Sequence, residues 1–306
     1  MRAFDMRKSF AIPLLLPALL LAPAALAGAP DPQAAQRGAY IFAVAGCAAC
    51  HTDVKNKGPL LAGGRALATP FGTFYGPNIT PDPVYGIGLW SDADFIRALR
   101  DGMRPDGAHL FPVFPYPSFT LMTDADMLDL KAYIFSLPAA ASPSRAHDVS
   151  FPFSWRWLQT FWRWLNFTPG PFEPDPHQSA AWNRGAYLVR ALAHCGECHT
   201  PRDLTGGLEN DLALSGNPKG PDNQKVPNIT PDKATGIGSW SHNQIVTFLR
   251  SGILPNGDVV GSTMGEVIAN GTSKMTDADR DAVATYLMSL PPHANPAAKA
   301  VQAGFD

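Results

Sequence analysis

The sequence predicts an all-α fold made of two copies of one domain, and two observations support this. Six segments of the first half recur in the same order in the second half, offset by 148 residues at the cysteines and by 153 at the last match. Each copy also carries three stretches with the apolar spacing of helices, and no stretch alternates like a strand. The 27 glycines and 30 prolines are expected in the loops between the helices.

The repeats set the expected domain boundaries. The matching segments are RGAY at 37–40 and 184–187, CxxCHT at 47–52 and 195–200, PNITPD at 77–82 and 227–232, GIGxWS at 86–91 and 236–241, MTDAD at 122–126 and 275–279, and SLP at 136–138 and 289–291. We therefore expect a first domain over 28–142, a linker over 143–178 and a second domain over 179–306.

Residues 1–27 have the composition of a cleaved secretory signal peptide. Three basic residues precede an apolar run from Phe10 to Leu21, and residues 25–27 read Ala-Leu-Ala, a cleavage pattern. The alternative is a retained membrane anchor, which three prolines in and after the run disfavour. No later segment is apolar over about 18 residues. The sequence therefore predicts an exported, periplasmic protein without a transmembrane span.

The three helices of each copy are expected to begin at equivalent positions: near residues 33 and 180, after Ser91 and Ser241, and after Thr123 and Thr276. The serines are favourable N-caps. T-x-x-D after each threonine resembles a capping box with Asp in place of Glu or Gln. Three short helices bury little apolar surface for a domain of roughly 110 residues. We therefore expect a cofactor to fill each core.

Each copy contains the motif Cys-x-x-Cys-His, at Cys47, Cys50 and His51 and again at Cys195, Cys198 and His199. This is the attachment signature of c-type haem. Two thiols on one turn can add to the two vinyl groups on one edge of the porphyrin, and the histidine then lies under the iron as its proximal ligand. The sequence therefore predicts two covalently bound haem c groups, which use all four cysteines as thioethers.

Two other kinds of site use Cys-x-x-Cys. A four-cysteine zinc site would take both pairs, and a thioredoxin-like redox pair would need a βαβ context, which is absent. Both pairs occupy the same place in their repeat and both precede a histidine, which neither alternative requires. The charge balance, 24 Lys+Arg against 26 Asp+Glu, also argues against a nucleic-acid binder.

These motifs, together with both PNITPD loops, both GIGxWS segments and the NRGAYL opening of domain two, resemble the dihaem c-type cytochromes that are electron-transfer subunits of bacterial periplasmic dehydrogenases. The resemblance covers residues 33–292. It implies two tandem, class I-like cytochrome c domains with Gly/Pro-rich loops around covalent haems. It also implies that electrons pass from a flavin, molybdenum or quinoprotein catalytic subunit toward the respiratory chain.

The sixth iron ligand is expected to differ between the two domains. A cytochrome c usually takes a methionine from the loop before its last helix. In domain two this is Met264, in a Gly-rich loop, unless it only fills core. In domain one Phe114 falls at the equivalent position and cannot ligate iron. Met122 and His109 are equal alternatives there, Met103 is a weaker one, and an open, five-coordinate iron is the last. We hypothesise that haem two is the higher-potential centre.

Further residues carry weaker expectations. Trp90 and Trp240 are equivalent, and in the resembling family a tryptophan here packs near the haem edge, which is compatible with plain core packing. Asn78 and Asn228 either hydrogen-bond near a haem propionate or shape a proline-flanked turn. His194, directly before Cys195, stands where domain one has a glycine; the alternatives are contact with a haem or a partner and a solvated side chain, and we expect the second.

The linker is rich in aromatic residues, with four of the seven tryptophans between 155 and 164. We expect a short amphipathic helix, with Arg156 and Arg163 as its cations. The favoured interpretation is that it fills the seam between the two domains. The other is that residues 151–167 dock a catalytic subunit or a membrane interface.

The sequence thus predicts a periplasmic dihaem cytochrome c that relays single electrons and has no catalytic activity of its own, because no nucleophile–base pair or nucleotide loop is present. Its partners would be redox proteins: a dehydrogenase catalytic subunit, and a terminal oxidase or another cytochrome. The rival is a dihaem oxidoreductase, such as a peroxidase or a sulfur-compound enzyme, with an open first haem. A haem-based sensor is a third class.

Overall fold

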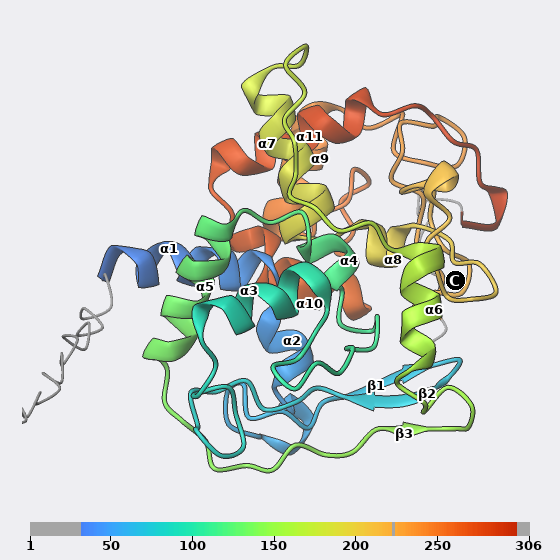
Figure 1. Ribbon diagram of the computed structural model, residues 1–306. Helices are drawn as coiled ribbons and strands as arrows, with labels where there is room; N and C mark the ends of the chain where they lie inside the picture. Colours follow the sequence, from blue (N-terminus) through green and yellow to red (C-terminus); the bar gives the residue numbers. More distant parts are fainter. Residues whose placement is uncertain (1–31, 222–223, 299–306) are drawn as a thin grey trace, which may run out of the picture.

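The computed structural model describes residues 32–221 and 224–298 (Figure 1). The signal peptide expected at residues 1–27 lies outside these residues. In Figure 1 the first half of the chain, blue to green, lies largely below the second half, yellow to red. No helix in the described part of the chain is long and apolar enough to cross a membrane.

The two halves contain matching helices. The first half has α1 (Pro32–Val44), α2 (Cys47–His51), η1 (Val54–Asn56), β1 (Ala66–Thr69), β2 (Gly72–Tyr75), α3 (Asp92–Asp101), α4 (Tyr116–Phe119) and α5 (Asp124–Ser136). The linker adds β3 (Asp148–Val149) and α6 (Leu158–Asn166). The second half has α7 (Ala180–Tyr187), η2 (Leu188–Leu192), α8 (Gly196–His199), η3 (Asn210–Leu212), α9 (His242–Ser251), α10 (Ser262–Asn270), η5 (Thr272–Lys274), α11 (Asp277–Ser289) and η6 (Pro296–Ala298).

The crossing of the first and last helices explains the repeated RGAY segment. Helix α1 packs against α5, and α7 packs against α11. A Cβ on Gly38 would lie 1.9 Å from the Asp129 carbonyl oxygen, and one on Gly185 would lie 2.0 Å from that of Ala282. Only glycine allows the two backbones of each pair to approach this closely.

The predicted serine N-caps are confirmed. Ser91 and Ser241 begin α3 and α9 with reciprocal capping boxes, which satisfy backbone N–H groups in the first turn. At α5 and α11 the threonines also accept as predicted, with Thr123 Oγ1 3.1 Å from the Asp126 N–H nitrogen. The second half of that box is missing, because the Asp126 carboxylate accepts from a tyrosine of the other domain.

The all-α prediction omits a small sheet. Strands β1, β2 and β3 form an antiparallel sheet in that order, with Ala66 opposite Tyr75 and Gly72 opposite Val149. The hairpin strands have four residues each, too short for an alternating pattern to stand out. The third strand comes from the linker, so its pairing depends on a contact between segments far apart in the sequence, which no local pattern reports.

A second expectation also needs correction. Met264 does not lie in a loop: it is the third residue of helix α10 and is half-buried. The Gly-rich segment ends at Gly261, which is the N-cap of this helix. Gly265 does not prevent the helix, because glycine costs only about 1 kcal/mol relative to alanine in a helix interior.

Two reciprocal tyrosine–aspartate pairs fasten the domains to each other. Tyr40 of α1 donates to the Asp279 carboxylate of α11, and Tyr187 of α7 donates to the Asp126 carboxylate of α5. The tyrosines occupy equivalent positions in the repeat, as do the aspartates, so the seam has an approximate internal two-fold symmetry. Contacts of α1 with η5 and of α4 with η2 repeat this relation. We refer to the four side chains as the tyrosine–aspartate clasp.

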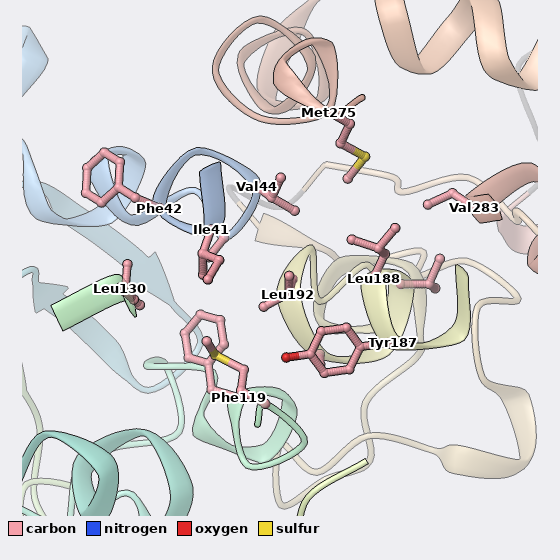
Figure 2. Close-up of a cluster of buried hydrophobic side chains, with 14 of the residues drawn as sticks. Ile41, Phe42, Val44, Phe119, Leu130, Tyr187, Leu188, Leu192, Met275 and Val283 are labelled. Carbon is pink, nitrogen blue, oxygen red and sulfur yellow. The ribbon is translucent and has the colours of Figure 1, made fainter. Parts of the chain in front are cut away.

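The seam is filled by one continuous apolar cluster. Figure 2 shows Ile41 and Val44 of α1 and Phe119 of α4 facing the same space as Leu188 and Leu192 of η2. These side chains are at most 6% exposed. Burial of a side chain of this size contributes about 1.5–3 kcal/mol. The domains are therefore fixed by a shared core and not only by the linker.

Helix α6 of the linker contacts both domains on one side and is exposed on the other. Trp162 Nε1 donates to the Thr205 carbonyl of domain two at 3.0 Å, and Arg163 donates to the Asp101 carbonyl of domain one. The seam interpretation therefore describes this side of α6. The other side is exposed, with Trp164 at 82%. We refer to the exposed aromatic residues of α6 and of the segment directly before it as the aromatic face: Phe151, Phe153, Trp155, Trp157, Phe161 and Trp164.

Candidate haem sites

Each Cys-x-x-Cys-His histidine is held in the same way. His51 Nδ1 lies 2.8 Å from the Pro77 carbonyl oxygen, and His199 Nδ1 lies 2.8 Å from that of Pro227. A carbonyl only accepts, so Nδ1 carries the proton and Nε2 keeps its lone pair. Such a hydrogen bond fixes the tautomer and the orientation of a metal-binding imidazole. This assigns a role to the proline that opens each PNITPD loop, whose carbonyl positions the histidine.

Two further pairs of contacts fasten the loop after each motif. Thr52 Oγ1 accepts the Leu61 N–H and Thr200 Oγ1 accepts the Leu214 N–H, both at 3.1 Å. The His51 carbonyl accepts from Gly63 at 2.8 Å, and the His199 carbonyl accepts from Gly216 at 2.7 Å. The threonine of the repeated CxxCHT segment therefore shapes the site.

Sequence reasoning missed the two glycines of this arrangement. Gly63 and Gly216 have φ of +82° and +89°. A Cβ on either would lie within 2.7 Å of the backbone nitrogen of Asn78 or Asn228. Both stand at the end of a short Leu-x-Gly match, at 61–63 and 214–216, but Gly63 follows His51 by 12 residues and Gly216 follows His199 by 17. The match is too short and its spacing too irregular to reveal them.

The four cysteines are free thiols in the structure. Burial and the partner thiol raise the pKa of Cys47 and of Cys195 to about 12. Burial also raises the pKa of Cys198 to about 11, with added contributions from Glu197 and from Cys50 of the other domain. The two attachment motifs lie near each other across the seam, since the ring of His194, directly before Cys195, lies 3.3 Å from the carbonyl oxygen of Ala45, two residues before Cys47.

These residues fit two covalent haems. Each motif supplies two neutral thiols on one turn and an imidazole whose Nε2 is free to bind iron. Burial lowers the pKa of His51 and of His199, more than the Pro77 and Pro227 hydrogen bonds raise it, which favours the neutral imidazole that ligates metal. Across residues 32–221 and 224–298, no three His, Cys, Asp or Glu side chains converge on a common metal site. The shared four-cysteine zinc site is therefore not formed.

The tryptophans and asparagines that recur near the two motifs behave differently. Trp90 and Trp240 are half-buried and pack against the core cluster. Both N–H bonds of the Asn78 amide are used, toward the Ala140 and Ser142 carbonyls at 2.8 and 2.9 Å. Asn228 likewise donates to His293 and Thr235. The asparagines therefore join the loop to the chain that follows the last helix.

The residues weighed as sixth ligands lie in different surroundings. Met122 is completely buried in the apolar cluster. Its equivalent, Met275, is also buried, and Figure 2 shows it between Val44 and Val283. The His109 ring is half-buried, and its Nδ1 has no hydrogen-bond partner in the described part of the chain. Phe114 is half-buried and packs on Phe119 with ring centroids 5.6 Å apart.

His194 is only partly exposed, whereas the sequence led us to expect a solvated side chain. It is half-buried, its Nε2 lies 3.3 Å from the Ala45 carbonyl oxygen of domain one, and its ring meets Phe119 edge-on at 5.3 Å. His147, to which the sequence assigned no role, accepts the Tyr75 N–H at 3.2 Å and packs between Phe74 and Phe111.

Comparison with known proteins agrees with this duplicated site. The cytochrome c family model matches residues 35–138 and again 183–291. The chain is 41% identical over 265 residues to a dihaem cytochrome c-type protein of Cereibacter sphaeroides, covering 84% of this chain and 86% of that protein.

Cytochrome subunits of two enzymes are also similar. Identity is 44% over 287 residues to the cytochrome c subunit of a quinone-dependent alcohol dehydrogenase of Gluconacetobacter polyoxogenes, covering 89% of this chain and 60% of that subunit. It is 40% over 257 residues to the fructose dehydrogenase cytochrome subunit of Gluconobacter japonicus, with 83% and 52% covered. The chain thus spans little more than half the length of these subunits. The chain belongs to the cytochrome c family, with two cytochrome c domains in tandem and a covalent haem c in each.

Proposed function

We propose that this chain is a periplasmic electron-transfer protein that takes single electrons from the catalytic subunit of a dehydrogenase and passes them toward the respiratory chain. The observation that carries the proposal is the seam, which holds two identically built haem sites in one fixed arrangement. An electron that enters one domain can then leave from the other. Two similar proteins are cytochrome subunits of alcohol and fructose dehydrogenases, which supports the choice of donor.

In this function the chain binds the two haems and holds their histidine ligands in place. Each iron, once bound, holds one electron by changing between its ferrous and ferric states. Cys47, Cys50, Cys195 and Cys198 would anchor the two porphyrins, and His51 and His199 would be the proximal ligands. The Pro77 and Pro227 carbonyls keep these imidazoles in one orientation. A ligand sphere that does not move when the charge of the iron changes keeps the reorganisation that accompanies electron transfer small.

The distal ligands belong to the same proposal. Met264, the third residue of α10, would be the distal ligand of haem two, and its thioether would raise the potential of that centre. For haem one the surroundings favour His109 over Met122. Met122 is buried in the apolar core, as is its equivalent Met275 in domain two, whereas the His109 ring has a nitrogen without a partner in the described residues. Burial lowers the pKa of His109, with a smaller contribution from Arg163, so the ring is neutral and able to ligate.

The test uses the mature, haem-loaded protein. A redox titration should show two one-electron steps. Mixing with the catalytic subunits of alcohol and fructose dehydrogenase, each with its substrate, should reduce the haem bands in at least one case. Failure of both subunits to reduce haems that dithionite does reduce would contradict the proposed donor class.

The aromatic face is the proposed docking surface for the catalytic subunit. Between residues 151 and 167 the only cations, Arg156 and Arg163, point inward to backbone carbonyls of domain one. The exposed side of this segment is therefore uncharged and rich in tryptophan, a composition typical of protein interfaces. Trp164→Ser should weaken binding and leave the free energy of unfolding within about 0.5 kcal/mol. Trp162→Ser, which removes a seam contact, should reduce stability instead.

One observation keeps a second function in view. Phe114 at the ligand position would leave haem one open if His109 does not bind, as a dihaem oxidoreductase requires. Carbon monoxide separates the two cases. Binding of carbon monoxide to one reduced haem would favour the oxidoreductase, and an unchanged spectrum would favour electron transfer alone.

A further inference from the structure

Domain two has one more residue than domain one between the repeated tyrosine and the first cysteine. Tyr40 precedes Cys47 by seven residues, and Tyr187 precedes Cys195 by eight. The structure absorbs the extra residue in η2, a π-helix over Leu188–Leu192. Single-turn π-helices of this kind are frequent at functional positions.

The consequence of the insertion is the placement of His194. It has a φ of +38°, at the position where domain one has Gly46 with a φ of +63°. Positive φ is unusual for a residue with a side chain, although histidine adopts it more readily than most. An imidazole therefore stands in the seam at a backbone position for which glycine suffices in the other domain.

Two ring contacts continue from His194 into domain one. Its ring meets Phe119 at 5.3 Å with the planes 81° apart, and Phe119 meets Phe114 at 5.6 Å with the planes 54° apart. Phe119 is 5% exposed. His194 is bonded to Cys195, a thioether residue of haem two, and Phe114 occupies the ligand position of domain one. The three rings form an unbroken series of contacts from one haem site to the other.

Polar contacts hold the middle of this series in place. Ser118, beside Phe119 on α4, donates to Glu197 Oε1 at 2.7 Å, and Arg202 donates to Glu197 Oε2 at 2.7 Å. The Glu197 side chain is only 10% exposed. Glu197 lies between Cys195 and Cys198, so α4 is fixed directly onto the second attachment motif.

We propose that Phe114, Phe119 and His194 provide the path along which electrons cross between the two haem domains, an inference that rests on the proposed electron-transfer function. The step oxidises one ferrous centre and reduces one ferric centre by a single electron. No bond is made or broken, no proton moves, and the rings are not themselves oxidised. Tunnelling decays less steeply through packed and bonded atoms than across gaps, so closely packed rings conduct better than aliphatic side chains that leave space.

The experiment measures the rate of internal electron transfer in the two-haem protein after rapid reduction of one haem by a light pulse. Phe119→Leu removes the central ring and keeps an apolar side chain. His194→Gly restores the residue type of domain one and suits the positive φ, so it should not impair folding. The matched control is Phe42→Leu, which breaks a ring pair of 5.1 Å with Tyr133 inside domain one, away from the seam. Visible spectra and both midpoint potentials are recorded for each variant.

We expect both path variants to slow internal transfer severalfold with spectra and midpoint potentials unchanged, and the control to match the parent. Rates equal to the parent in His194→Gly would overturn the path and point to direct transfer between the two haems. Slowing that is accompanied by shifted potentials, or that appears equally in the control, would also overturn it. Failure of the proposed function looks different: the parent itself would then not be reduced by a dehydrogenase subunit, whatever the variants do.

Discussion

The proximal sides of the two domains match closely, whereas their distal sides differ. In both, a proline carbonyl lies 2.8 Å from the histidine Nδ1 and a glycine with positive φ donates to the histidine carbonyl. At the position proposed for the distal ligand, domain two has Met264 on a helix, and domain one has Phe114 packed on Phe119. Haem attachment requires one geometry, so both copies keep it. The distal side controls potential and contacts, so the copies can diverge there.

The largest expected effect tests whether the proximal geometry is truly shared. Gly63→Ala and Gly216→Ala should each lower the free energy of unfolding by about 3 kcal/mol, because a Cβ would be strained at positive φ and would also meet backbone atoms. Chemical unfolding followed by the haem bands measures this. The control is Gly107→Ala, at a φ of +79° with nothing within 4 Å of the new Cβ. An equal loss in Gly107→Ala would show that close approach does not matter.

The second prediction exchanges the distal residues. Met264→Ala should abolish the thioether–iron absorption band and lower one midpoint potential, because the ligand that stabilises ferrous haem is lost. Phe114→Met should add a second such band once His109 is also replaced by alanine, which frees the distal position of haem one. Met288→Ala, at an exposed methionine, should change neither. If the spectrum of Met264→Ala equals that of the parent, Met264 only fills core.

The third prediction separates the two halves of the clasp. Asp279 also receives two hydrogen bonds from Arg184, at 2.8 Å each, whereas no arginine hydrogen-bonds to Asp126 in the described residues. Tyr187 additionally accepts the Thr123 N–H at 3.2 Å. Tyr187→Phe should therefore cost about 2 kcal/mol and Tyr40→Phe about 1 kcal/mol, since the first removes two hydrogen bonds and leaves the Asp126 carboxylate without a donor among the described residues, whereas Asp279 keeps both bonds from Arg184. Urea titrations compare them, and the reverse order would contradict this account.

The smallest expected effect is a pH dependence at the clasp. Burial raises the pKa of Asp279, but the hydrogen bonds from Arg184 and Tyr40, with the Arg184 charge, outweigh it and hold the pKa below its ordinary value. The unfolded chain then binds more protons than the native one in the acid range, so stability rises with pH. The contribution is complete above about pH 5 and is lost as the pH falls below about 3.9.

Urea midpoints measured at neutral and acid pH check this dependence. Asp279→Asn should lose less stability on acidification than the parent does, because its side chain cannot titrate. If Asp279→Asn lost as much stability on acidification as the parent, the pH dependence would come from other carboxylates.

Some features needed no structure, because they depend on neighbouring residues. Ser91 and Ser241 cap their helices as their sequence context predicts, and the six repeated segments fix the duplication. The T-x-x-D prediction was half right, since the threonine part is local. The aspartate part failed because Tyr187 and Tyr40, distant in sequence, take the carboxylates that a capping box would use.

The sequence by itself determined that the chain is duplicated, that each copy attaches a haem c, and that the copies differ at Phe114 and Met264. These conclusions rest on residue types at short, fixed spacings, whose chemistry does not depend on the rest of the fold. The tertiary structure alone decided that β3 joins a sheet with domain one, that His194 is enclosed in the seam, and that α6 turns Trp162 inward and Trp164 outward. Each of these depends on which distant segments meet, and packing of the whole chain decides that.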